Sequence, residues 1–511
     1  MTRPTLYDRF AAHAESRPDA SALLWEDETI SYGELASMAD DAYAELESSR
    51  LPDDRPIGLR ARKSPRAIAL VLAALRSGRP FLLPSVELAP ETLAKLFAQA
   101  GASRVLEPHG PRSESTSLRA IADPAADIAD DEPSQWPPPG GGDDVAFMLT
   151  TSGSTGLPKI VPLPAAAVDR FTDWAAEQFE IGPGTVVANY APLNFDLCLL
   201  DIWTTLKHGG TVALVDQDKA TQAAYLAELV DGSKVEVLQA VPMLYRLLLD
   251  VAREENRKFA GVRHVITTGD KIPPSTLEAL PELFPNARFY NIYGCTETND
   301  SFIHEFVGLA EGNVPSNVPI GRPLPDVKTV ILTEDGPPLE GTGTGELLVS
   351  TPFQTRGYMN QSLNPDKFSP RSDNGAGEIM YYRTGDIVQV HDDGTVTLEG
   401  RADFYVKVRG VRVSTQVVEQ AILEHPDVVE CAVVAVPDEL AGKKLHAVIR
   451  RSPESKLNSL ALRKHCAERL ARTEMPSTIE FVTEPLPKTS TGKVDRKRVL
   501  AQLEEMSHAH G

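Results

Sequence analysis

The spacing of apolar residues predicts alternating helices and strands over most of the chain. Residues 6–17 form an amphipathic pattern, residues 31–47 begin with a serine suited to cap a helix, and residues 67–78 are almost continuously apolar. Short apolar strands alternate with further helical segments and lie at 145–150, 185–191, 211–215, 235–241 and 264–269. This alternation is typical of an α/β fold with layered β-sheets and helices, and it continues to about residue 390.

The end of the chain has its own pattern. Residues 399–413 are predicted as strands, 416–425 as a helix and 429–437 as a further strand, followed by a polar helix and a basic tail. This predicts a β-α-β-α unit of about 110 residues, small enough to act as a separate lid. The stretch 107–144 has many Pro, Gly and Ser residues and no periodicity, so we expect a surface connection inside the larger part.

Charge and cysteine content narrow the function classes. The chain has 511 residues, and its 51 Lys and Arg against 72 Asp and Glu give 51 − 72 = −21. This charge disfavours nucleic acid and anionic membranes as partners. The four cysteines have no close pairs, and the sequence contains neither a signal peptide nor an apolar run long enough to span a bilayer. We therefore expect a soluble cytoplasmic protein.

A Ser/Thr/Gly-rich segment follows the predicted strand 145–150. It reads TTSGSTGLPK over residues 150–159, and its glycines allow close backbone approach while its hydroxyls and Lys159 can bind phosphate oxygens. It lacks the spacing of a Walker A loop. The alternative is a flexible turn without a ligand.

Three other segments carry polar groups suited to a nucleotide. Residues 290–300 (YNIYGCTETND) offer an aromatic for a purine, a threonine for a phosphate and Glu297 for Mg²⁺. Asp386 in YRTGD can accept hydrogen bonds from ribose hydroxyls, with Arg401 about fifteen residues later. Lys493 in PKTSTGKVDR can neutralise charge that develops at a phosphate. Taken singly, these segments also fit a strand-to-loop turn, a surface ion pair and a solvated basic tail.

Together these segments resemble one family. TSGSTGLPK, YGCTETND, YRTGD, GRADFYVKVRG and STGKVDR, in this order, are similar to the adenylate-forming superfamily of acyl-CoA synthetases, luciferases and nonribosomal peptide synthetase adenylation domains. The resemblance covers nearly the whole chain. It implies an N-terminal body, 1–402, that binds ATP and substrate, and a mobile α+β lid, 403–511, that carries the catalytic lysine. Asp403 would be the hinge between them.

The resemblance also implies roles for individual residues. Thr296, Glu297 and Lys493 would be catalytic, with Glu297 as the Mg²⁺ ligand, and Lys407 and Gly410 would face the thiol donor in the second half-reaction. The implied ATP-binding residues are Thr151, Ser152, Gly153, Ser154, Thr155, Gly156, Lys159, Gly269, Asn291, Tyr293, Gly294, Asp386 and Arg401.

Three positions depart from the family pattern. Tyr405 replaces a glutamine, Ser414 stands where glutamate is common, and Cys295 replaces a proline. None of these changes removes a group needed for adenylation, but Tyr405 and Ser414 lie on the face expected to meet the thiol. The details of thiol transfer are therefore less firmly implied than adenylation.

The segment 194–203 indicates which acid is activated. NFDLCLLDIW resembles the FDxSxxD/E junction of amino acid adenylation domains, in which the aspartate pairs with the substrate ammonium. Asp196 would have this role, because a substrate without an amine would leave its carboxylate unpaired. The alternative is that Asp196 caps the following helix.

The remaining pocket positions are mostly apolar and of medium size, which favours a small aliphatic or cyclic amino acid. GCTETNDSF also resembles prolyl-carrier-protein ligases, so proline or an analogue is the leading single prediction. Asp300 suits a second amine or a hydroxyl on the substrate unless it faces solvent. The implied substrate-binding residues are Asp196, Leu197, Leu200, Met243, Ile266, Thr268, Ile292, Asp300 and Ser301.

The predicted reaction uses ATP and Mg²⁺ to convert the amino acid to aminoacyl-AMP and pyrophosphate. The acyl group would then pass to the phosphopantetheine thiol of a separate carrier protein in nonribosomal peptide or antibiotic biosynthesis, because the chain has no carrier or condensation motif. The alternatives are an acyl- or aryl-CoA ligase of the same fold and a non-catalytic nucleotide-binding scaffold.

Overall fold

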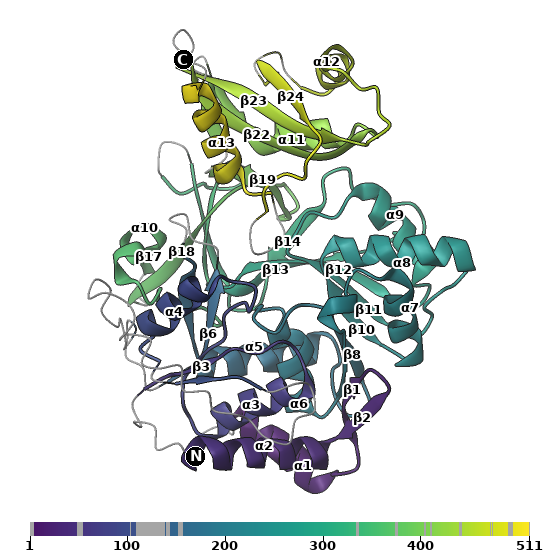
Figure 1. The fold of residues 1–511 in the computed structure, drawn as a ribbon, viewed down its shortest axis with the longest axis vertical. Helices are drawn as coiled ribbons and strands as arrows, with labels where there is room; N and C mark the ends of the chain where they lie inside the picture. Colours follow the sequence, from purple (N-terminus) through teal and green to yellow (C-terminus); the bar gives the residue numbers. More distant parts are fainter. Residues whose placement is uncertain are drawn as a thin grey trace. The chain divides into compact units, whose positions relative to one another are not determined.

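The computed structural model divides the chain into two compact units. The first comprises residues 1–330, 348–383 and 390–397, and the second 331–347, 384–389 and 398–511. Figure 1 shows the helices and strands of both units. The structure describes residues 5–48, 55–102, 104–108, 138, 144–151, 157–333, 337–373, 377–402, 405–408, 411–438, 442–470, 472, 474–488 and 494–509.

The first unit is an α/β body. Its elements in chain order are α1 (Leu6–Ser16), β1 (Ser21–Trp25), β2 (Glu28–Ser31), α2 (Tyr32–Ser48), β3 (Ile57–Leu59), α3 (Pro65–Arg76), β4 (Phe81–Leu82), α4 (Pro90–Gln99), β5 (Val105–Leu106), β6 (Val145–Thr151), β7 (Lys159–Pro164), α5 (Ala165–Gln178), β8 (Val186–Asn189), the π-helix η1 (Leu199–Thr204), α6 (Thr205–His208), β9 (Thr211–Leu214), η2 (Gln217–Lys219), α7 (Ala223–Gly232), β10 (Val237–Ala240), α8 (Pro242–Glu255), β11 (His264–Thr268), α9 (Pro274–Leu283), β12 (Arg288–Cys295), β13 (Asn299–Phe306), β14 (Pro319–Pro323), η3 (Gln361–Leu363), α10 (Asn364–Lys367) and β17 (Phe368–Asp373).

Two sheets organise this body. One contains the run β14-β13-β12-β11-β10-β8-β9-β1-β2, and the other has the order β5-β3-β4-β6-β7. Strands β8 to β12 pair in parallel, whereas β12 and β13 form an antiparallel pair. The parallel strands end at one edge of the sheet, where loops that follow them can gather side chains of different segments. Four further strands contain residues of both units: β15 (Lys328–Leu332), β16 (Gly343–Ser350), β18 (Gly377–Val390) and β19 (Val396–Arg401).

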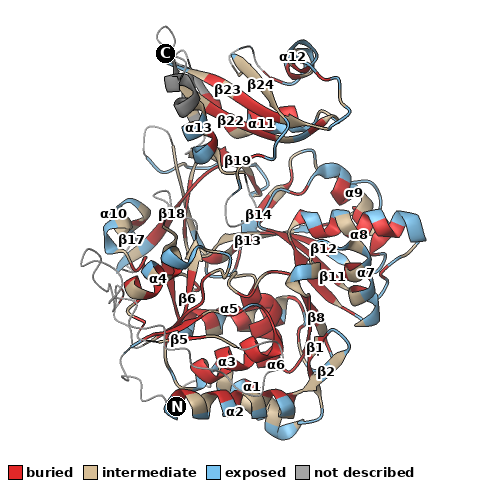
Figure 2. Cartoon of the chain, in the orientation of Figure 1, coloured by how far each residue is buried: buried red, intermediate tan, exposed pale blue. Residues whose placement is uncertain are grey.

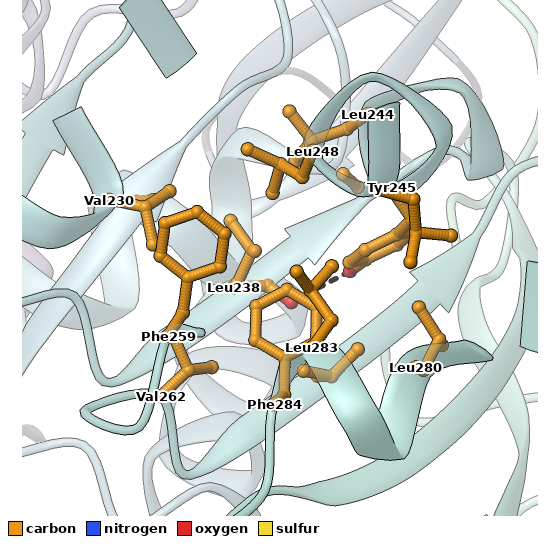
Figure 3. Close-up of a cluster of buried hydrophobic side chains, with 14 of the residues drawn as sticks. Val230, Leu238, Leu244, Tyr245, Leu248, Phe259, Val262, Leu280, Leu283 and Phe284 are labelled. Atoms are coloured by element: carbon orange, nitrogen blue, oxygen red, sulfur yellow. Dashed lines mark hydrogen bonds between the residues drawn. The ribbon is translucent and has the colours of Figure 1, made fainter. Parts of the chain in front are cut away.

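The parallel strands of the larger sheet are apolar because they lie in the hydrophobic core of the body. Strands β10 and β11 are completely buried (Figure 2), because helices α7, α8 and α9 cover them. Figure 3 shows the aromatic rings of Phe259, Phe284 and Tyr245 packed among leucines from these helices. The Tyr245 hydroxyl lies near the carbonyl oxygens of Leu238 and Ile266, at 3.0 and 2.8 Å, so this buried polar group is satisfied.

The N-terminal helices and the strands predicted at 145–150, 211–215 and 264–269 are confirmed. The serine cap before α2 is present as a reciprocal pair, since Glu34 N donates to Ser31 Oγ and Ser31 N donates to Glu34 Oε2 at 3.2 and 2.8 Å. The fold class, a layered α/β body with a smaller α+β part, is likewise confirmed. Most of the predicted connection at 107–144 lies outside the described residues.

The second unit contains a strand pair, a three-stranded sheet and helices. Its elements are β20 (Tyr405–Val408), β21 (Val411–Ser414), α11 (Thr415–Leu423), β22 (Val428–Asp438), β23 (Gly442–Arg451), α12 (Ser459–Ala467), β24 (Thr478–Val482) and α13 (Arg496–Ala509). The sheet order is β22-β23-β24. The sequence pattern missed β23 and β24, because lysines, arginines and a histidine interrupt the apolar alternation in GKKLHAVIRR and because TIEFV is short.

Ion pairs with Glu419 and Glu430 attach the C-terminal segments of the second unit. Arg496 at the start of α13 donates from Nε to Oε1 of Glu419 at 2.7 Å, and Glu419 also accepts from the backbone N of Val433. Glu430 forms ion pairs with Lys488 and with Arg450. The chain segments on either side of residues 489–493 are thus attached to α11 and β22. The predicted domain boundary at residue 402 stays a prediction.

No helix in the described parts of the chain is long and apolar enough to cross a membrane. The four cysteines are free thiols, in agreement with the absence of close pairs in the sequence.

Candidate active site

Some predicted site residues lie outside the described residues. These are Ser152, Gly153, Ser154, Thr155, Gly156, Asp403, Gly410 and Lys493. Lys407 belongs to strand β20, where it pairs with Arg412.

A hydroxyl of one tyrosine joins two predicted ATP-site residues. The Tyr358 hydroxyl donates to Glu297 Oε1 at 2.6 Å, and Lys159 Nζ donates to the same hydroxyl at 3.5 Å. Tyr382 lies 3.1 Å away, oxygen to oxygen. Glu297 is only 5% exposed, so the hydrogen bond from Tyr358 replaces part of the solvation that its carboxylate loses on burial. Lys159 and Glu297, which are far apart in sequence, are therefore brought together through Tyr358.

The turn between β12 and β13 presents Thr296 and Glu297. It follows a register shift between Tyr293 and Gly294, and Gly294 lies against Asn299, whose carbonyl oxygen would be 2.4 Å from a Cβ at residue 294. Only glycine fits this approach. The carbonyl of Glu297 accepts from the backbone N of Thr355 at 2.9 Å, which attaches the turn to a second segment of the body.

Asp196 lies beside this turn. Burial raises the pKa of the Asp196 carboxyl, whereas a hydrogen bond from the Thr296 side chain lowers it and the Glu297 carboxylate raises it. Thus Asp196, predicted to pair with an ammonium, interacts with Thr296 and Glu297, which are predicted to bind phosphate and Mg²⁺. The alternative that Asp196 caps a helix is wrong, since the following helix η1 begins at Leu199 with Cys198 in the N-cap position.

A buried polar network near Asp196 was not predicted from the sequence. Asp201 is fully buried and accepts from Asn189 Nδ2 at 3.0 Å and from Gln239 Nε2 at 2.8 Å. Gln239 Nε2 also donates to the carbonyl of Leu197 at 3.1 Å, directly after Asp196. Burial raises the pKa of Asp201 to about 8 despite these two amide donors. A carboxylate inside the apolar run LCLLDIW was the available signal, because such a group requires partners.

Lys63, which lies just before α3, stabilises the same region. It is 4% exposed and donates from Nζ to the carbonyl oxygens of Asn189 and Ala191, both at 2.9 Å, and of Tyr190 at 3.3 Å. Burial lowers its pKa to about 8. The lysine therefore fixes the end of β8, from which the segment containing Asp196 continues. In the sequence, the position of Lys63 just before the apolar helix predicted at 67–78 gave only a weak indication of this role.

Asp300 is a further carboxyl near this group. Burial raises its pKa to about 8, and the carboxyls of Asp196 and Asp201 add to the increase. Asp300 is partly buried in β13, opposite Gly294. Among the described residues its side chain has no hydrogen-bond partner. The predicted second polar position of the pocket is thus electrostatically coupled to Asp196.

The other predicted pocket positions differ in exposure. Ile266, Thr268 and Ile292 are buried on adjacent strands, where Thr268 and Ile292 pair across β11 and β12. Leu200 and Ser301 are also buried, and Leu197 is partly buried. Met243 is 48% exposed near the start of α8. These positions form a mostly apolar set with hydroxyls at Thr268 and Ser301.

The remaining predicted ATP residues of the first unit lie in or next to strands β6, β11 and β12. Thr151 Oγ1 is buried at the end of β6 without a partner among the described residues. Asn291 is bonded to the Pro319 carbonyl at 2.7 Å. Tyr293 makes an edge contact with Phe302 at 5.9 Å between ring centroids. Gly269 follows β11 with φ 77°, a left-handed conformation that favours glycine.

Asp386 and Arg401 lie in the second unit. Arg401 Nη1 donates to Asp386 Oδ1 at 2.9 Å. Asp386 N donates to Thr384 Oγ1 at 3.0 Å, and Gly385 between them has φ 77°. This tight turn directs the carboxylate toward the arginine, so the predicted pairing of these two residues is present.

The donor atoms of these residues fit ATP and Mg²⁺. Mg²⁺ prefers one or two carboxylate oxygens together with phosphate oxygens and water. Tyr358 occupies Oε1 of Glu297, and Oε2 has no hydrogen bond from the described residues. The unpartnered hydroxyl of Thr151 and the ammonium of Lys159 are suited to phosphate oxygens.

The fold is that of adenylate-forming enzymes. The o-succinylbenzoate CoA synthetase of Bacillus subtilis, solved with an acyl-adenylate intermediate, has a TM-score of 0.81 at 21% identity, with 98% of each chain covered. Klebsiella oxytoca NpsA, solved with 3-hydroxyanthranilyl-AMSN, has a TM-score of 0.76 at 23% identity, with 98% of this chain and 100% of the other covered.

Sequence comparison gives the family. Residues 10–359 match the AMP-binding enzyme family and residues 417–493 match the AMP-binding enzyme C-terminal domain, so the chain belongs to the AMP-binding enzyme family. A D-alanine--D-alanyl carrier protein ligase of Bacillus licheniformis is 28% identical over 98% of this chain and 99% of its own length. An L-proline--[L-prolyl-carrier protein] ligase of Pseudomonas fluorescens is 30% identical over 98% and 99%.

We expect Asp300→Asn to change how stability depends on pH. With a folded-state pKa of about 8 against an ordinary 3.8, the Asp300 carboxyl keeps its proton in the folded chain over a range in which the unfolded chain loses it. Stability contributed by the protonated carboxyl is therefore lost as the pH rises from about 4 to about 8. In urea unfolding, the stability of Asp300→Asn relative to the wild type should increase over this range.

Asp250→Asn is the matched control, because Asp250 is exposed on α8. Its stability difference from the wild type should not vary with pH. The same pH dependence in both variants would contradict the assignment to Asp300.

Proposed function

We propose that this protein is an amino acid--[carrier protein] ligase that forms an aminoacyl-AMP. The observation that carries the proposal is the position of Asp196, a partly buried carboxyl whose pKa is lowered by the Thr296 side chain and raised by the Glu297 carboxylate. This arrangement supports a site for an ammonium group beside residues suited to phosphate and Mg²⁺. The D-alanine and L-proline carrier protein ligases support the same reaction class.

An amino acid fits this pocket better than an acid without an amine. The carboxyls of Asp196 and Asp201 raise the pKa of Asp300, and Asp201 accepts from the side-chain amides of Asn189 and Gln239. The nearby Lys63 is bonded to three carbonyl oxygens, so its ammonium is not directed at Asp196. A substrate ammonium would supply the missing positive charge and favour the ionised form of Asp196. An aryl or fatty acid would leave that carboxylate unpaired.

In the first half-reaction, a carboxylate oxygen of the amino acid attacks the α-phosphorus of ATP. A P–O bond to this oxygen forms, the bond to the bridging oxygen breaks, and pyrophosphate leaves with its electron pair. Thr296 would donate to the α-phosphate, and Thr151 to Lys159 would bind the leaving pyrophosphate. Glu297 would hold Mg²⁺, which neutralises phosphate charge. Lys493, outside the described residues, would stabilise the added charge in the transition state.

The other proposed roles concern nucleotide recognition. Tyr293 would stack on adenine, supported by Gly269, Asn291 and Gly294, while Asp386 and Arg401 would bind the ribose. Asp386 is already oriented by its bond to Arg401, and a carboxylate can accept hydrogen bonds from ribose hydroxyls.

In the second half-reaction, a thiol attacks the acyl carbon of the aminoacyl-AMP. The thiol loses its proton, a thioester forms and AMP leaves. We assign the thiol to the phosphopantetheine arm of a carrier protein, since the sequence is also 28% identical to part of a dimodular nonribosomal peptide synthase of Bacillus subtilis. The strand β20 with Lys407, and Gly410 after it, would face this arm, and Asp403 would be the hinge.

The size of the substrate follows from the buried apolar positions. Leu200, Ile266 and Ile292 restrict the pocket to a small or cyclic side chain. Proline or an analogue is the leading candidate. Asp300 extends the candidates to amino acids with a second amine or a hydroxyl, because its carboxyl has no described protein partner.

ATP–pyrophosphate exchange over a substrate panel tests the function. The panel contains proline, both alanine enantiomers, small diamino and hydroxy amino acids, and aryl and fatty acids. We expect exchange with an amino acid of small or cyclic side chain and none with the acids that lack an amine. Exchange with an aryl or fatty acid alone would favour a CoA ligase.

Replacement of Asp196 by Asn should affect the amino acid selectively. The amide keeps the size of the side chain but removes the charge that pairs with ammonium, so the KM for the amino acid should rise about 10- to 100-fold. The KM for ATP should change far less. Equal increases in both values, measured by the exchange assay, would argue against the ammonium role.

Lys493→Ala should abolish adenylate formation while nucleotide binding persists. The charge of Lys493 acts mainly in the transition state, so we expect kcat for exchange to fall by roughly 100- to 1000-fold. Equilibrium binding of ATP should remain within about twofold. An unchanged exchange rate would remove Lys493 from the mechanism, and Lys497→Ala serves as the control for loss of a nearby positive charge.

A further inference from the structure

Contacts to one buried tyrosine hydroxyl connect four residues from separate segments of the body. Lys159 begins β7, Glu297 lies in the turn after β12, Tyr358 precedes α10, and Tyr382 lies in β18. The Tyr358 hydroxyl contacts all three of the others, at 3.5 Å to Lys159 Nζ, 2.6 Å to Glu297 Oε1 and 3.1 Å to the Tyr382 hydroxyl. Both tyrosines are almost completely buried.

The donor count fixes the direction of these hydrogen bonds. A tyrosine hydroxyl has one proton and two lone pairs. Because Tyr358 donates its proton to Glu297, it must accept from Tyr382, and its second lone pair faces the Lys159 ammonium. All hydrogen-bonding positions of the Tyr358 hydroxyl are therefore used. Burial and the Glu297 carboxylate both raise the pKa of Tyr358, which keeps the proton on its oxygen.

The backbone and ring of Tyr358 are fixed as well. Its backbone N donates to Asn364 Oδ1 at 2.8 Å, and Asn364 Nδ2 donates to the Tyr358 carbonyl at 3.3 Å. Gly357 permits this contact, since a Cβ there would lie 2.8 Å from Asn364 Nδ2. The Tyr358 ring packs edge-on against Phe368 with centroids 5.6 Å apart. A ring held on several sides cannot follow Glu297 if the carboxylate turns away.

We propose that Tyr358 is a positioning residue that orients the Glu297 carboxylate for a divalent cation and sets its distance from Lys159. By occupying Oε1, the hydroxyl leaves Oε2 as the oxygen offered to the cation. The Lys159 ammonium lies 4.7 Å from the centroid of the same ring, so one side chain positions both the metal ligand and a phosphate-binding cation. This inference rests on the proposed function, in which Glu297 binds Mg²⁺.

The test compares binding of a non-hydrolysable ATP analogue with and without Mg²⁺. Calorimetry gives two dissociation constants, and their ratio measures the contribution of the metal ion separately from nucleotide binding. In Tyr358→Phe the carboxylate loses the hydrogen bond that orients it, so the ratio should fall about tenfold. A general loss of structure would weaken binding in both conditions and leave the ratio unchanged.

Tyr32→Phe is the matched control. Tyr32 is also fully buried in the first unit, and its hydroxyl donates to the carbonyl oxygens of Gly210 and Leu206 at 2.8 and 3.3 Å. Its variant loses a buried hydroxyl of the same kind without contact to Glu297. We expect an unchanged Mg²⁺ ratio in Tyr32→Phe.

Two further variants keep the inference testable if Tyr358→Phe unfolds. Tyr382→Phe removes the donor to Tyr358 and should lower the ratio in the same direction by about threefold. Glu297→Gln should lower it at least as much as Tyr358→Phe. Thermal unfolding identifies which variants are folded at the assay temperature.

The outcomes separate the two proposals. An unchanged ratio in folded Tyr358→Phe, or in Tyr382→Phe where Tyr358→Phe is unfolded, overturns the positioning role. An unchanged ratio in Glu297→Gln also overturns it, because no metal ligand then remains to be positioned. Absence of amino acid-dependent exchange in the wild type contradicts the proposed function instead, and this is measured without reference to the Mg²⁺ ratio.

Discussion

The burial of several carboxyls in one region of an acidic protein is the constraint on which the site depends. The chain has a net charge of −21, and Asp196, Asp201, Asp300 and Glu297 all lie partly or wholly out of solvent. The donors differ among these carboxyls: Asp201 accepts from two side-chain amides, Glu297 accepts from a tyrosine hydroxyl, and the Thr296 side chain lowers the pKa of Asp196. Neutral donors stabilise these groups only in part, since burial still raises the pKa of Asp201 to about 8. The region is therefore suited to cations supplied by ligands.

Lys63 and Lys159 lie near this region, but their ammonium groups contact other parts of the protein. Lys63 stabilises three carbonyl oxygens at the end of β8 and so determines where the Asp196 segment begins. Lys159 faces the Tyr358 ring and hydroxyl. Neither arrangement gives Asp196 or Asp300 a direct salt bridge among the described residues. A lysine paired with Asp196 would compete with a substrate ammonium. Because Lys63 is bonded to carbonyl groups instead, the negative charge of Asp196 remains available to the proposed substrate.

Sequence motifs were sufficient to predict the fold class and the site residues that lie close together in the sequence. Thr296 and Glu297 follow a strand and a required glycine, and Asp386 and Arg401 are joined by a short connection, so their positions are local. Sequence analysis missed Tyr358, Gln239 and Lys63, because each acts on a segment remote in the chain and none belongs to a pattern with its own periodicity. It also missed β23 and β24, in which charged residues conceal the alternation. Tertiary contacts, and not local preference, determine these features.

The coupling between Asp196 and Glu297 gives the proposed ligands an influence on each other. The Glu297 carboxylate raises the pKa of Asp196, so an uncompensated Glu297 favours the protonated, neutral form of Asp196. A divalent cation at Glu297 would cancel this effect and favour the ionised Asp196 that an ammonium requires. On the proposed roles, metal-bound nucleotide therefore promotes amino acid binding, and linkage requires the amino acid to promote nucleotide binding by the same factor. The tyrosine that fixes Glu297 would also determine the strength of this coupling, because it sets the distance between the two carboxyls.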